Sequence, residues 1–90
     1  MESNNSNKNE REVKLREFDY SFISRSEAKR LLQNLDKFNT VILDFKGIKM
    51  IGQGFADELF RVWKNKHPDI FVKGINMGKS VEMMVGMVGK

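Results

Sequence analysis

Two parts of the chain repeat each other at a distance of 28 residues, and this repeat limits the folds available. The shift pairs apolar residues with apolar residues: Val13 with Val41, Leu15 with Leu43, Ala28 with Ala56, and Leu31 with Leu59. Two copies are too few for a solenoid, which needs at least about three. The repeat therefore predicts a strand–loop–helix unit used twice, and consecutive units of this kind favour a parallel sheet with right-handed crossovers.

Three segments are predicted to form strands. Residues 13–16 alternate apolar and charged side chains, which is typical of a half-exposed strand at a sheet edge. Residues 41–45 are almost continuously apolar, as in a strand covered on both faces, and residues 70–75 form the third strand. We expect a small single-layer α/β fold, a mostly parallel or mixed sheet of three to four strands with about three helices packed on it.

Apolar residues at helical spacing mark the three helices, within residues 28–35, 56–63 and 81–88. Ser24 and Glu27 have the spacing of a capping box at the start of the first helix. That helix is expected to end at Asn39 and Thr40. The second is expected to end at His67, because the following proline disfavours helical conformation there.

Length and composition bound the organisation of the chain. Ninety residues make one domain, in which we expect a disordered polar leader at residues 1–11 and a folded part at residues 12–90. The N-terminus has no apolar core typical of a signal peptide. The longest uncharged run, residues 83–89, is far shorter than a membrane span. We expect a cytoplasmic protein without a membrane partner.

Composition also excludes several kinds of chemistry. The absence of cysteine rules out disulfides, thiol catalysis and cysteine zinc sites, and a single histidine rules out a His-rich metal site. That histidine, His67, has no nucleophile or orienting acid near it in sequence. A Ser-His-Asp set assembled in space has no positive support. We therefore expect no enzyme, no cofactor and no metal.

The segment from Gly74 to Ser80 resembles a phosphate-binding P-loop, but it has three residues between its first glycine and the Gly-Lys pair instead of four. The simpler interpretation is that Gly78 turns the chain and that Lys79 and Ser80 begin a helix. Asp44, at the end of the second strand, is then expected to accept backbone N–H groups of the neighbouring loop. A nucleotide-binding domain remains a third reading.

The loops that precede the first two helices allow other sites. Gly52 and Gly54 lie at a helix N-terminus, where free amides attract anions, although glycines there more often permit tight turns and close packing. Ser24 and Ser26 lie at the matching place before the first helix. Capping explains Ser24, so Ser26 is the better candidate phosphoacceptor.

Surplus apolar residues are the strongest functional signal. Phe55 and Val62 widen the apolar face of the second helix, and Met83 and Met87 flank that of the third. Methionines are common at adaptable binding surfaces. The alternative is that a small sheet needs wide helices to cover it, and the sequence leaves both interpretations open.

Residues 41–60, which include the run Gly-Gln-Gly-Phe-Ala-Asp-Glu, resemble the STAS-like family, small bacterial domains related to the anti-sigma-factor antagonists. Residues 24–32 and the segment around Asn76 are also similar to that family. The resemblance covers residues 13–88. It implies a sheet with helices packed on it, no enzymatic activity, and docking to a protein partner. In the antagonists this partner is a serine kinase with a histidine-kinase-type ATPase fold.

The resemblance also implies where the chain departs from its relatives. The phosphorylated serine of the antagonists lies in a segment that aligns with residues 52–55, and no Ser or Thr lies between Gly47 and Trp63. A phosphorylation switch therefore cannot operate at that loop. Docking by the surrounding surface is the leading hypothesis, and the expected partner-binding residues are Gly52, Gln53, Gly54, Phe55, Asp57, Glu58, Arg61, Met83 and Met87.

The rival hypothesis is a small nucleic-acid-binding protein. It rests on a net charge of +4, a pI near 9.5 and one tryptophan. The basic residues concerned are Lys46, Lys49, Arg61, Lys64 and Lys66. Acidic residues are interleaved with them, and no stacking motif is present. Self-association through residues 13–16 or through the methionine edge is a further expectation.

Overall fold

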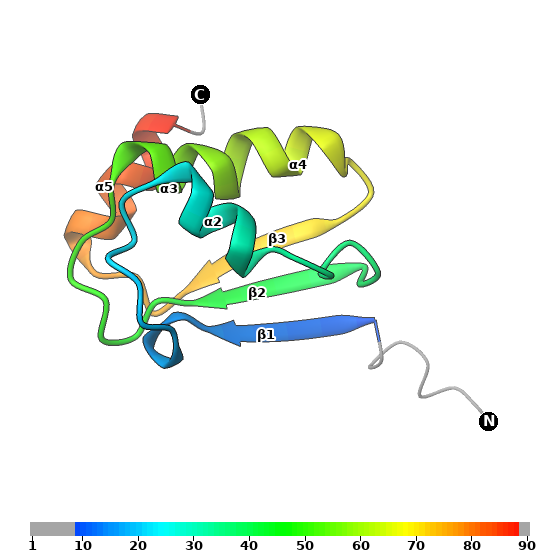
Figure 1. Cartoon of the computed structure of the whole chain (residues 1–90), viewed down its shortest axis with the longest axis horizontal. Helices are drawn as coiled ribbons and strands as arrows, with labels where there is room; N and C mark the ends of the chain where they lie inside the picture. Colours follow the sequence, from blue (N-terminus) through cyan, green and yellow to red (C-terminus); the bar gives the residue numbers. More distant parts are fainter. Residues whose placement is uncertain (1–8, 89–90) are drawn as a thin grey trace.

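In a computed structural model, which describes residues 9–88, three parallel strands form one sheet in the order β1-β2-β3. Helices α2 and α3–α4 lie on one side of it, and α5 packs against α3 (Figure 1). This is the small α/β fold that the sequence predicted. The elements are β1 (Glu10–Lys14), a 3-10 turn η1 (Leu15–Glu17), α2 (Arg25–Leu31), β2 (Thr40–Asp44), α3 (Gln53–Asp57), a π-helical segment η2 (Glu58–Val62), α4 (Trp63–Lys66), β3 (Phe71–Ile75) and α5 (Lys79–Val88).

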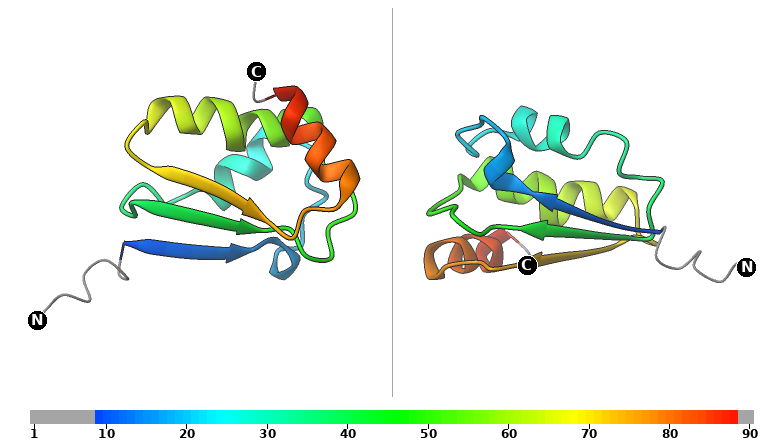
Figure 2. Two further views of the ribbon diagram at one scale, coloured as in Figure 1. Left: turned by 180° about the vertical axis from the view of Figure 1, so that it is seen from behind. Right: turned by 90° about the horizontal axis from the view of Figure 1, so that it is seen from below.

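The inner face of the sheet carries the apolar residues that the alternation predicted. Val13 pairs in register with Leu43, and Val41 pairs with Val72, and these side chains are buried beneath the helices. The opposite face carries the row Glu12, Ile42 and Lys73. No helix of the described chain covers that face (Figure 2). The prediction that β2 is covered on both faces is therefore wrong, and Ile42 is half-buried.

The first strand differs from its predicted bounds at both ends. It begins at Glu10, so Glu10 and Arg11 belong to the sheet and not to a leader. Both side chains are exposed, so burial does not hold them in place. Their backbone pairing with β2 is what orders these two residues. The strand ends at Lys14, and the fully buried Leu15 begins the 3-10 turn that carries the chain up toward the helices. The rest of the predicted leader, residues 1–8, lies outside the described residues.

The first helix begins where the capping box predicted and ends earlier than expected. The Ser24 hydroxyl accepts from the Glu27 amide, and the Glu27 carboxylate accepts from the Ser24 amide, which confirms the box. The helix ends at Leu31, because the chain turns back toward β2 through Asn34, whose φ of +66° is left-handed. Leu35 is nevertheless buried, so its apolar character reflects the core and not a helical face.

The second and third helices begin and end close to their predicted positions. Residues 53–66 are continuously helical and end before His67, as the proline at position 68 predicted. The π-helical segment in the middle of this helix had no sequence signal, and such segments are frequent at functional sites. It contains Glu58 and Arg61, two of the predicted site residues.

Candidate docking surface

The carboxyl ends of the three strands are tied together by Asp44. Its carboxylate accepts hydrogen bonds from Asn76 Nδ2 (2.9 Å), the Lys46 amide (3.0 Å) and Arg16 Nη1 (3.1 Å). These donors follow β3, β2 and β1 respectively. They lower the pKa of Asp44 to about 2, with the largest contribution from Asn76. The predicted bond to the adjacent loop is confirmed, and Asp44 is engaged in holding the sheet ends.

The glycines before the second helix serve close packing. The Gly52 amide donates to the Phe22 carbonyl (2.8 Å), and the Phe55 amide donates to the Ile23 carbonyl (3.1 Å). A Cβ on Gly52 would lie 2.7 Å from the Ile23 carbonyl oxygen, a distance shorter than the Cβ contacts found in folded proteins. These two amides are already paired within the chain, so the close-packing interpretation accounts for Gly52.

The segment that meets these glycines is held by Glu27. Its carboxylate accepts from the backbone amides of Ser21 (2.8 Å), Ile23 (2.9 Å) and Ser24 (3.2 Å). The amides of Ile23, Ser21 and Ser24 lower the pKa of Glu27 to about 2. The predicted phosphoacceptor Ser26 is exposed, with its hydroxyl 3.1 Å from that of Ser24. Its modification remains a prediction.

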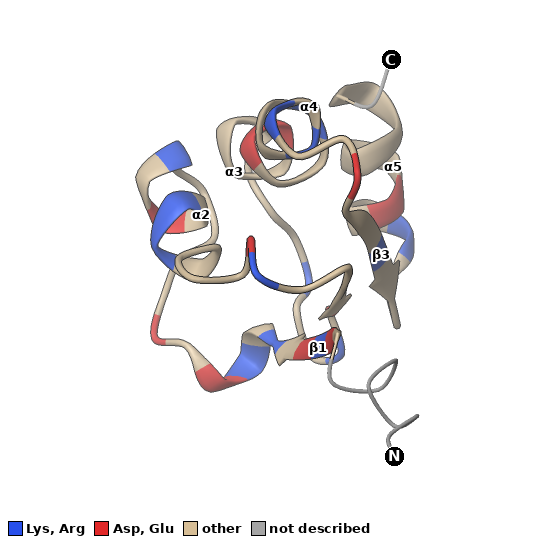
Figure 3. Cartoon of the chain, turned by 90° about the vertical axis from the view of Figure 1, so that its right-hand side faces the viewer, with Lys and Arg blue, Asp and Glu red and all other residues tan. Residues whose placement is uncertain are grey.

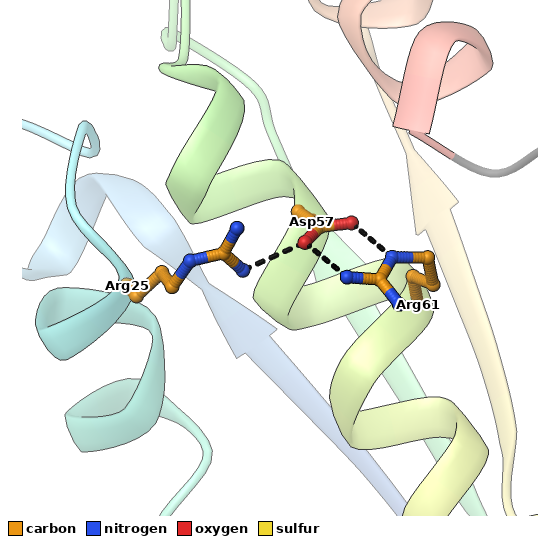
Figure 4. Close-up of polar contacts among 3 residues, drawn as sticks. All are labelled: Arg25, Asp57 and Arg61. Carbon is orange, nitrogen blue, oxygen red and sulfur yellow. Dashed lines mark hydrogen bonds and ion pairs between the residues drawn. The ribbon is translucent and has the colours of Figure 1, made fainter.

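A charged cluster joins α2 to α3. Asp57 accepts a hydrogen bond from Arg25 Nη1 (2.7 Å) and two from Arg61, through Nε and Nη2 (Figure 4). The hydrogen bonds from Arg61 and Arg25 hold the pKa of Asp57 well below its usual range. Both arginine side chains remain about half exposed, whereas the Asp57 side chain is almost buried. Each arginine therefore still presents N–H donors to solvent.

Three of the predicted partner-binding residues are buried. The Phe55 side chain is fully buried and packs against the Phe22 ring, so its description as a surface contact is wrong. Asp57 and Glu58 are also buried, and Asp57 is engaged by the two arginines. These residues turn inward because α2 lies directly beside the second helix, a contact that the sequence does not encode locally.

The exposed predicted residues belong to two neighbouring elements. Gln53 and Arg61 are exposed on the second helix, and Gly52 and Gly54 are partly exposed at its start. Met83 and Met87 are each 63% exposed on α5, which packs against α3. A surface groove of about 460 Å³ runs along α5, and its lining is apolar apart from one end: Lys79, Ser80, Met83, Met84 and Met87. We call this feature the α5 groove.

Other parts of the chain bear on the alternative functions. Gly74, the first glycine of the P-loop-like segment, lies within β3 and not in a loop. Lys and Arg are spread over α2, α4, α5 and the start of the chain's first strand, with Asp and Glu between them (Figure 3). The position of Gly74 within a strand does not favour the P-loop hypothesis, and the mixture of charges along these ribbons does not favour the nucleic-acid hypothesis.

Sequence reasoning missed two features of this region. Arg25 was not among the predicted site residues, although it completes the cluster around Asp57. A surface pocket of about 470 Å³ between α2 and α4, lined in part by Glu58 and Trp63, was also missed. Both depend on the placement of α2 against the second helix, residues 53–66, and no local pattern in the sequence reports it.

Comparisons with known proteins identify one family. Residues 27–82 match a family described as a STAS-like domain of unknown function (DUF4325). No curated protein and no solved structure matches the chain. None of the helices within residues 9–88 has the length and apolar content needed to cross a bilayer. In the same part of the chain, no group of three or more His, Cys, Asp or Glu could hold a metal ion.

Proposed function

Because the chain belongs to the STAS-like family DUF4325, we propose that it is a non-catalytic regulatory module that docks onto a protein partner in the cytoplasm. The α5 groove is the observation that carries this proposal. It combines two large exposed methionines with a half-buried third on one helix. Apolar patches rimmed by polar groups mark interaction sites, and methionine side chains adapt to a partner's shape.

The proposed surface extends from the α5 groove to the exposed part of the second helix. Arg61 and Gln53 are the exposed polar residues of the neighbouring elements, since α5 packs against both α3 and η2. The two guanidinium groups held on Asp57 favour an acidic counterpart. We propose a regulator with a histidine-kinase-type ATPase fold as the partner class. Control by phosphate at residues 52–55 is not part of the proposal, since no hydroxyl is present there.

A tagged pull-down from the lysate of the native host tests the proposal. The bait is washed at two salt concentrations with and without nuclease, and bound proteins are identified by mass spectrometry. We expect stoichiometric recovery of one protein that withstands nuclease and the higher salt. Recovery of nucleic-acid-associated proteins alone, lost on nuclease or salt, would favour the nucleic-acid hypothesis, because such binding weakens steeply with salt.

The docking surface itself is tested with matched variants. Met83→Lys combined with Met87→Lys places two charges in the α5 groove, and we expect at least about a tenfold loss of partner affinity. Met50→Lys is the control, because Met50 is 68% exposed and lies in the loop before α3. If the double variant remains folded and binds the recovered partner as tightly as Met50→Lys does, the α5 groove is not the interface.

A further inference from the structure

Three acidic side chains are buried in the described chain, and one of them differs from the other two. Asp44 is paired with Arg16, and Asp57 with Arg25 and Arg61. Glu58 is only 4% exposed, and within residues 9–88 its carboxylate forms no direct ion pair or hydrogen bond; its nearby positive charge is Arg61, whose guanidinium is already bound to Asp57. A buried carboxylate without a hydrogen-bond donor is unfavourable, so its retention calls for a donor that completes it.

The surroundings of Glu58 indicate what that group is. Glu58 is one of the residues that line the pocket between α2 and α4, which places the pocket beside this buried acid. Trp63 and Leu32 form the apolar part of the lining, and the Trp63 ring lies tilted against the His67 ring with centroids 4.2 Å apart. Asp36 contributes a second acid. A carboxylate in a partly apolar, aromatic surrounding binds organic cations mainly by charge-assisted hydrogen bonds, with a further contribution where the cation meets an aromatic ring.

We propose that this pocket binds a guanidinium or ammonium group that pairs with Glu58. Lys29 and Lys66 also line the pocket, but both are exposed and neither lies within ion-pair distance of the carboxylate. They place positive charge at the rim, where it can pair with an anionic group carried by the same ligand. The pocket shares no residue with the α5 groove, so this binding site does not depend on the proposed docking function.

Titration of the intact chain by NMR tests the proposal with three probes. Agmatine represents a free small molecule, acetyl-Gly-Arg-Gly-amide represents a protein side chain, and acetyl-Gly-citrulline-Gly-amide is the uncharged control. We expect saturable shifts of the Trp63 indole N–H with agmatine or the arginine peptide and none with citrulline. Tighter binding of agmatine would indicate a metabolite as the source, and tighter binding of the peptide would indicate a partner's arginine. Absence of saturable shifts, or equal shifts with citrulline, overturns the site.

Substitutions separate the cation site from a merely structural carboxylate. Glu58→Gln keeps the shape of the side chain and should weaken probe binding at least about tenfold, whereas Glu82→Gln, an exposed acid on α5, should leave it unchanged. Lys29→Met with Lys66→Met tests whether a lysine occupies Glu58 instead. The proposal predicts unchanged thermal stability and equal or tighter binding in that variant. A clear loss of stability without a gain in binding overturns it, even if Glu58→Gln fails to fold.

Discussion

Arg25 Nη1 lies 2.7 Å from Asp57 Oδ2, and this contact joins the first turn of α2 to α3 across 32 positions of sequence. Arg61, one turn further along the second helix, binds the same carboxylate. The carboxylate retains 10% of its exposure, while the arginine side chains retain 50% and 48%. The acid is thus the desolvated member of the cluster, and its two partners remain hydrated.

This asymmetry predicts which substitutions in the cluster are costly. Arg25→Met combined with Arg61→Met leaves a buried carboxylate unpaired, whereas Asp57→Asn leaves two arginines that water already solvates. We expect the double variant to lose more free energy of unfolding than Asp57→Asn, measured by urea denaturation at pH 7. Addition of Asp57→Asn to the double variant should recover part of the loss. An equal or smaller loss in the double variant would show that burial of Asp57 does not govern the cluster.

Gly52→Ala is predicted to destabilise the fold by about 1–3 kcal/mol, the usual cost of overpacking a site that cannot yield. The added methyl group would lie 2.7 Å from the Ile23 carbonyl oxygen and 2.8 Å from the Ile23 Cα, both of them backbone atoms. Gly86→Ala is the control, because its methyl group would meet no atom of the surrounding structure within 4 Å beyond its own helix backbone and chain neighbours, and alanine favours the helix by about 0.5–1 kcal/mol. Similar unfolding midpoints for the two variants would contradict the close packing at Gly52.

Acid should destabilise the protein through the carboxylates whose pKa is lowered in the fold: Glu27, Asp44 and Asp57. The pKa values of Glu27 and Asp44 are lowered from 4.5 and 3.8 to about 2, by hydrogen bonds that exist only in the folded chain. A lowered pKa means that the stabilisation is present above the unfolded value and is lost as the pH falls through the folded value. We expect the unfolding midpoint in urea to decrease between about pH 5 and pH 2. Glu27→Gln should reduce this slope, and an unchanged slope would remove Glu27 as its cause.

Much of the fold could be predicted, because the local sequence patterns agree with the burial and hydrogen bonding found in the structure. The inner face of β2, with Val41 and Leu43, is apolar in sequence and buried in the structure, and the Ser24–Glu27 box begins α2 as expected. One position that sequence reasoning misplaced depends on a backbone reversal. Leu35 has helical spacing from Ala28, yet the left-handed Asn34 between them ends any continuation of the helix. Residues other than glycine seldom signal such a conformation in sequence.

The candidate site was predicted less completely, because burial on a helix depends on what packs against it. When only the second helix is considered, Phe55 is an apolar residue beyond those needed for the buried face of that helix. In the structure, the segment before α2 reverses at Phe22, whose φ is +61°, and the Phe22 ring covers Phe55 at a centroid distance of 5.5 Å. Met83 and Met87 of α5 were predicted as surface residues and are exposed, because no element of the described chain reaches over them.

The buried Phe55 and the exposed methionines of α5 should therefore respond differently to substitution. Phe55→Ala should destabilise the fold by about 3–5 kcal/mol, since it removes a fully buried aromatic ring and leaves a cavity. Met83→Ala, at a side chain that is 63% exposed, should change the free energy of unfolding by less than about 0.5 kcal/mol. Urea denaturation of the two variants measures both values. A large loss for Met83→Ala would mean that this methionine stabilises the chain itself, and its exposure would then no longer favour a partner at the α5 groove.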